Sequence, residues 1–141
     1  MFFLSNYKRS VHNISCMQVK IDTKEKFHVI TVIDPELAAS MTEDMGIKLL
    51  PYLQNGVKNV VLNLSGVKRV DTAAAEKLVL IQQSFYEEGA SFVICGLQQT
   101  VEDFLDESEL LEIMNVTPTE SEAWDIVQME EIERELLDGD S

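Results

Sequence analysis

The chain has 141 residues, of which 45% are hydrophobic and 26% are charged, as is typical of one globular domain with a modest core. It contains no apolar run of about 18 residues, so no membrane insertion is expected. Its short apolar opening is followed rather than preceded by Lys8 and Arg9. This order is unlike that of a signal peptide, and we expect a cytoplasmic protein.

The charge is concentrated in the last third of the chain. Residues 97–141 hold 15 acidic side chains and one basic one, Arg134, and thus carry the whole net charge of −14. Such a surface repels the phosphate backbone, so we expect no nucleic-acid partner. It is either a solvated helical face or a docking face for a basic partner.

The hydrophobic pattern of residues 1–33 predicts an extension followed by a β-hairpin. Residues 1–16 show no hydrophobic period and are expected to form a flexible extension. Residues 17–21 alternate apolar and polar side chains, residues 27–33 are rich in β-branched ones, and residues 22–26 between them suit a turn. Because the regular pattern begins at Met17, that methionine is an alternative to Met1 as the true start.

A helix is predicted directly after the hairpin. Asp34 suits the N-cap and Pro35 the first turn, and the pattern extends to about Leu53. We expect a break near Pro51, because proline cannot donate a hydrogen bond to the Ile47 carbonyl.

The rest of the chain alternates short apolar strands with amphipathic helices. Strands are predicted at 60–64, 91–95 and 116–118; helices at 72–88, 100–106 and 119–137; and a frayed tail at 138–141. The apolar faces are Ala74, Leu78, Ile81 and Phe85 in the middle helix and Ala123, Ile126, Val127, Ile132 and Leu136 or Leu137 in the terminal one. The order ββαβαβαβα predicts a single α/β domain over residues 17–137, with a mostly parallel sheet of four or five strands covered by helices.

The loops at the carboxyl ends of these strands are the expected place for a site. The longest, residues 65–72, ends with Thr72 at a helix N-terminus, where a phosphate is electrostatically favoured. Asp71 before it either caps this helix or belongs to the site. Lys68 and Arg69 are either an exposed loop pair or cations that neutralise a phosphate on Thr72 or meet an acidic partner.

Other chemistry has little support in the residues. His12 and His28 have no partners at metal-ligand spacing, and no glycine-rich phosphate loop is present, so neither a metal nor a cofactor is expected. Cys16 and Cys95 are not expected to form a disulfide; Cys95 and Trp124 suit the core.

Several motifs in order resemble those of the STAS domains, the anti-anti-sigma-factor fold of bacterial regulators. The family pattern Asp-Leu-Ser-Gly-Val stands here as Asn63 to Val67, and Asp-Ser-Ser-Gly-Leu stands as Asp71 to Ala75. Asn63 therefore replaces an Asp, and Ala73 and Ala74 replace Ser and Gly. Later features also match: the turn at 87–89, Cys95-Gly96, the helix near 101–105 and the stretch 118–123. The resemblance covers about residues 17–128.

The resemblance implies a binding module rather than an enzyme. Its best-known members are anti-sigma factor antagonists, which capture a kinase-type anti-sigma factor and are released when that kinase phosphorylates the residue at the position of Thr72. The nucleotide belongs to the partner. The partner-binding residues that the resemblance and the loops imply are Asp34, Ser65, Lys68, Arg69, Asp71, Thr72, Ala73 and Gly96.

Two alternatives stay open. One is a constitutive STAS assembly subunit of a stress-signalling or lipid-transport complex, which the Ala73-Ala74 replacement suits. The other is a small α/β enzyme with Asp71 and Thr72 as catalytic residues, disfavoured by the lack of a paired base or metal ligands.

Overall fold

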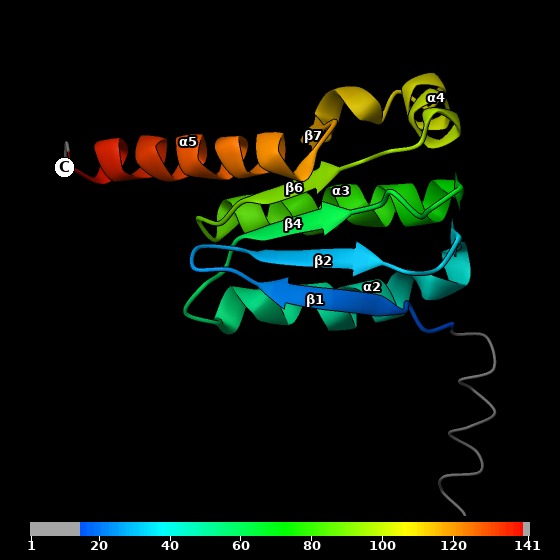
Figure 1. Cartoon of the computed structure of the whole chain (residues 1–141), viewed down its shortest axis with the longest axis horizontal. Coiled ribbons are helices and arrows are strands. Elements are labelled where there is room, and N and C mark those ends of the chain that lie inside the picture. The colour runs from blue at the N-terminus through cyan, green and yellow to red at the C-terminus, as the bar shows by residue number, and fades with distance from the viewer. Residues whose placement is uncertain (1–14, 140–141) are drawn as a thin grey trace, which may run out of the picture.

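The computed structural model describes residues 15–139 (Figure 1). A five-stranded sheet with the order β1-β2-β4-β6-β7 forms its centre. β1 is antiparallel to β2, and β2, β4, β6 and β7 run parallel to one another. The strands are β1 (Val19–Thr23), β2 (His28–Val32), β4 (Val60–Asn63), β6 (Phe92–Cys95) and β7 (Val116–Thr117). The predicted α/β class, hairpin and mostly parallel sheet are confirmed.

In residues 15–139, four α-helices connect and cover these strands. They are α2 (Thr42–Leu49), α3 (Thr72–Glu87), α4 (Gln99–Glu107) and α5 (Glu120–Gly139), with short 3₁₀ helices η1 (Ala39–Met41), η2 (Leu50–Gln54) and η3 (Leu111–Ile113). The expected break near Pro51 is confirmed, because α2 ends at Leu49 and the chain continues as η2.

The two faces of the sheet are covered by different helices. Side chains alternate along β4, so Val60 and Leu62 join the core formed with α2 and α3, whereas Val61 joins a second, smaller core with α5. The predicted apolar face of α3 is confirmed: all four of its residues, Ala74, Leu78, Ile81 and Phe85, are buried in the larger core. Each of the three large side chains, Leu78, Ile81 and Phe85, stabilises the fold by roughly 1.5–3 kcal/mol through its burial.

The segment after the hairpin differs from the prediction. Asp34 does not cap a helix; its carboxylate accepts a hydrogen bond from the Gln18 amide at 2.6 Å. The next residues form a short strand, β3 (Glu36–Leu37), that pairs in parallel with β5 (Arg69–Val70). The α-helix begins only at Thr42. Pairing with a distant segment thus overrides the local helix-start signal, and the predicted order lacked these two strands.

The predicted N-terminal extension lies mostly outside the described residues. Met17 belongs to the core: it is fully buried, and its amide donates to the Asp44 carboxylate at 2.6 Å. Lys48 pairs with the same carboxylate at 2.9 Å. Burial alone would raise the pKa of Asp44, but the Met17 hydrogen bond and the Lys48 charge hold that pKa below its ordinary value of 3.8.

The terminal helix follows the prediction in its first half only. Ala123 and Val127 are fully buried against the sheet, whereas Ile132, Leu136 and Leu137 are 56%, 66% and 72% exposed. The reason is geometric: Ile132 and Leu136 lie on the side of the helix opposite Ala123 and Val127, and Leu137 lies in the part of α5 that runs past the amino ends of β4 and β6 (Figure 1).

Cys95 is buried in the smaller core, as expected. Trp124 is only half-buried: it packs against the edge of that core and stacks on Phe27, with ring centroids 4.7 Å apart. In the described part of the chain, no helix has the length and apolar character needed to cross a membrane.

Candidate functional site

A hollow of about 520 Å³ lies at the carboxyl end of the sheet, between the loop before α3 and the start of α4. Its walls are Lys68, Arg69, Val70, Asp71 and Thr72 on one side and Thr100, Val101 and Phe104 on the other. Four of the predicted site residues, Lys68, Arg69, Asp71 and Thr72, therefore meet in one place. The contribution of α4 was not predicted; of the loop before it, only Gly96 was among the expected site residues.

Thr72 is exposed and is the first residue of α3, as predicted. Asp71 occupies the N-cap position, but its side chain makes no cap hydrogen bond. Its carboxylate instead accepts from the Ala39 amide at 3.0 Å, and the Asp71 amide donates to the Leu37 carbonyl at 2.9 Å. Asp71 is thus the N-cap residue of α3, as one of the two readings had it, but the amides of the first turn receive no hydrogen bond from its side chain.

The two neighbouring cations differ in their surroundings. Arg69 donates through Nε to the Glu36 carboxylate at 2.8 Å, and this hydrogen bond, with the charge of Glu36, raises the pKa of the Arg69 guanidinium. Lys68 forms no ion pair among the described residues, and its amide donates to the Pro35 carbonyl at 2.7 Å. Lys68 is thus the cation whose charge remains available at the rim.

Ser65 and Gly96 lie beside the hollow rather than in it. Gly96 has φ of +76°, and a Cβ there would stand 3.2 Å from the Ser65 Cβ, so only glycine suits this close approach. Asn63 stabilises the same loop with its side-chain amide: its Oδ1 accepts a hydrogen bond from the Ser65 amide at 2.8 Å, and its Nδ2 donates one to the Glu120 carboxylate at 3.0 Å. An Asp at position 63 would lack that donor and would face a like charge.

The remaining predicted residues are spread around this edge. Ala73 is exposed on the first turn of α3, next to Thr72, while Ala74 is fully buried, its methyl group within the larger core. Asp34 does not line the hollow. Its neighbour Pro35 contacts the site, because the Pro35 carbonyl accepts hydrogen bonds from the backbone amides of Lys68 and Arg69.

Two further observations describe the chemistry of this edge. Burial, and to a smaller extent the charge of Glu120, raise the pKa of the nearby Cys95 thiol to about 11, which makes it a poor nucleophile. Among the residues that the structure describes, no three His, Cys, Asp or Glu side chains gather as metal ligands would.

The comparison with family models decides the family. The model of the STAS domain matches residues 12–123. The chain belongs to the STAS domain family. The search of curated proteins found no match to this chain.

Solved structures share its fold. An anti-sigma factor antagonist from Mycobacterium paratuberculosis is 13% identical with a TM-score of 0.68, and the match covers 79% of this chain and 94% of that one. The anti-sigma factor antagonist SpoIIAA in its unphosphorylated form is 18% identical, with a TM-score of 0.62 and coverage of 79% and 96%. The murine anion transporter solute carrier 26 family member A9 is 14% identical, with a TM-score of 0.63, and the match covers 88% of this chain and 24% of the transporter.

Proposed function

We propose that this STAS domain is a cytoplasmic anti-sigma factor antagonist, without catalytic activity of its own. It binds a kinase-type anti-sigma factor at the hollow between the α3 N-terminus and α4, and phosphorylation of Thr72 controls the binding. The observation that carries the proposal is the meeting of Lys68, Asp71 and Thr72 with α4 in one exposed hollow. Two of the structures with this fold are named as anti-sigma factor antagonists, one of them in an unphosphorylated form, which supports it.

The hollow has the properties of a protein-binding surface. The half-buried Phe104, which packs above the buried Val101, gives it an apolar side, and the charged groups of Lys68 and Asp71 stand on the other side. An apolar centre with a polar rim is the usual arrangement at protein interfaces. A partner docked here would cover the exposed Thr72 hydroxyl.

A phosphoryl group on Thr72 would change this surface in two ways. It adds a charge of about −1.5 to −2 and bulk at the centre of the contact. The positive end of α3 tolerates the charge within the domain, because the first turn lacks a side-chain cap. The partner, however, would have to approach two neighbouring negative groups, the phosphate and Asp71, so docking is disfavoured.

A second candidate is a constitutive assembly subunit that binds its partner without phosphorylation. It is favoured by the ion pair of Arg69 with Glu36, which engages a cation that a phosphate on Thr72 would otherwise meet. The fold also occurs as a part of a larger transporter chain. Insensitivity of partner binding to the state of Thr72 distinguishes this candidate from the switch.

The test uses purified kinase-type anti-sigma factors from the same genome, one at a time. With the cognate partner and ATP, wild type should gain a phosphoryl group on Thr72 by mass spectrometry, and Thr72→Ala should gain none. By calorimetry, Thr72→Glu should bind at least about tenfold more weakly than wild type, roughly 1.4 kcal/mol, while Thr72→Ala binds as wild type. Gln128→Glu, which adds the same charge on the exposed surface of α5, is the control and should bind normally.

The outcomes separate the candidates. Equal affinity of Thr72→Glu and Thr72→Ala removes the switch and leaves the constitutive subunit. Failure of every kinase-type anti-sigma factor to bind removes the anti-sigma role itself.

A further inference from the structure

The last turns of α5 carry an exposed apolar stripe. Met129, Ile132 and Leu136 are 56%, 56% and 66% exposed. Their spacing of three and then four residues places them on one side of the helix. The buried residues Ala123 and Val127 lie on the other side, so this outer stripe faces away from the domain.

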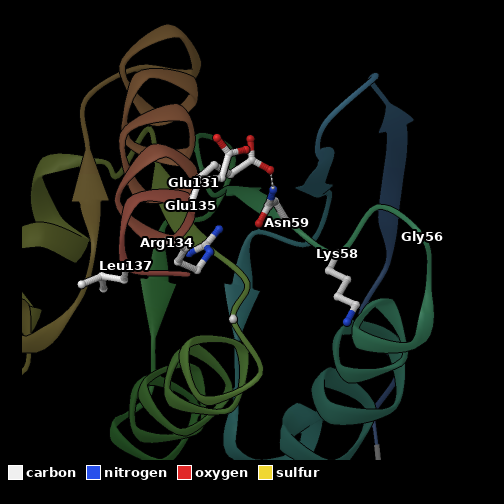
Figure 2. A pocket seen from close by; sticks show the side chains of 8 residues that line it. Gly56, Lys58, Asn59, Glu131, Arg134, Glu135 and Leu137 are labelled. Atoms are coloured by element: carbon white, nitrogen blue, oxygen red, sulfur yellow. Dashed lines mark hydrogen bonds between the residues drawn. The ribbon is translucent and has the colours of Figure 1, made fainter. Parts of the chain in front are cut away.

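Polar contacts fix the orientation of the helix. Glu130 accepts from the Ser91 hydroxyl at 2.6 Å, Arg134 donates to the same oxygen at 3.3 Å, and Asn59 donates to Glu131 at 2.9 Å. Figure 2 shows the last of these contacts, with Arg134 nearby on the domain side of α5. Because these groups hold the inner side, α5 cannot turn the outer stripe toward the sheet without breaking them.

The charges of α5 indicate what can cover the stripe. From Glu120 to Leu137 the helix holds seven acidic residues and one basic residue, Arg134, and Arg134 is directed to Ser91. By helical geometry Glu133 and Glu135 lie on either side of the stripe. A second copy would bring the same negative charges to the contact, so a basic surface is the complementary one.

We propose that the outer stripe of α5 is a docking surface for a basic amphipathic helix of another protein. The three-then-four spacing is the one with which helices pack along each other, and cationic side chains beside the partner's apolar seam would meet Glu133 and Glu135. This surface lies at the opposite end of the molecule from α4 (Figure 1), so it is independent of the site proposed for the anti-sigma factor. The domain could hold both partners at once.

The test uses a designed helical peptide of three heptads with Leu at positions a and d and Lys at e and g. Wild type should bind it in fluorescence anisotropy, more weakly as salt rises, and should not bind the matched peptide with Glu in place of Lys. The triple variant Met129→Ser, Ile132→Ser and Leu136→Ser should bind at least about tenfold more weakly. The control, Ile47→Ser with Leu80→Ser, removes two exposed apolar side chains from α2 and α3 (61% and 57% exposed) and should bind as wild type. Because all five positions are exposed, the variants should retain the wild-type circular dichroism.

Three results would overturn the proposal. The first is no binding of the Lys peptide up to about 1 mM, the weak end of specific affinities. The second is equal affinity of wild type and the triple variant, which would make the attraction one of charge alone. The third is sedimentation of wild type as a dimer and of the triple variant as a monomer, which would identify the occupant as a second copy.

Discussion

Replacing Gly96 by alanine should destabilise the domain at the edge of its site. Gly96 has φ of +76°, and the added methyl would stand 3.2 Å from the Ser65 Cβ and 3.4 Å from the Asn63 Oδ1. The left-handed conformation costs a non-glycine residue about 1–2 kcal/mol, and displacing a packed neighbour adds about 1 kcal/mol. Gly96→Ala should therefore lose about 2–3 kcal/mol, with Tm lower by roughly 5–10 °C.

The assay is urea unfolding followed by circular dichroism, with Gly56→Ala as the matched control. A Cβ at Gly56 meets nothing within 4 Å, and this residue has no positive φ. Its free energy of unfolding should stay unchanged or rise by up to about 1 kcal/mol, because alanine reduces the entropy of the unfolded chain. A Gly96→Ala free energy within about 0.5 kcal/mol of wild type would refute the reasoning about the Gly96 backbone and its contact with Ser65.

Three further predictions concern single side chains. In the same urea assay, Asn63→Asp should lower the free energy of unfolding by about 1 kcal/mol, because it removes the donor to Glu120 and adds a like charge. Adding Glu120→Gln to this variant should recover the lost stability, and a single variant as stable as wild type would contradict the contact. The pKa of Asp44 is lowered in the folded state, so its stabilisation is present above the ordinary pKa of 3.8 and is lost as pH falls below that value, through the lower folded-state pKa. Asp44→Asn should flatten that part of the curve of stability against pH, and an unchanged slope would count against it. With a thiol reagent at about pH 8, the exposed Cys16 should react quickly. The buried Cys95, whose thiol has its pKa raised to about 11, should react only after unfolding. Rapid reaction of both thiols in the native protein would disprove the burial of Cys95.

The elements with strong periodicity could be predicted from the sequence. The alternation in the hairpin, the apolar run at 60–64 and the spacing of Ala74, Leu78, Ile81 and Phe85 all reflect burial, which dictates residue type directly. The position of Thr72 at the start of α3 followed from the same pattern. Its nearness to Lys68, Arg69 and Asp71 is local in sequence, so it needed no tertiary information.

What was missed depends on contacts between distant segments. The pairing of Glu36–Leu37 with Arg69–Val70 joins two-residue strands that have no periodicity to detect. The ion pair of Arg69 and the hydrogen bond of Asp71 to Ala39 follow from that pairing. The exposure of Ile132 was missed for another reason: by helical geometry it lies on the side of α5 opposite Ala123 and Val127, so it is not part of the side that the sheet buries.

The short pairing of β3 with β5 also bears on how the site responds to a partner. With the Asp71–Ala39 hydrogen bond, it ties the start of α3 to the segment that leads into α2. The amides of Lys68 and Asp71, which donate to Pro35 and Leu37, should therefore exchange with deuterated solvent slowly for a surface loop. A partner that docks here meets a surface already ordered, so little conformational entropy is lost on binding. A modification of Thr72 would accordingly act through charge and bulk at the contact rather than by rearranging the loop.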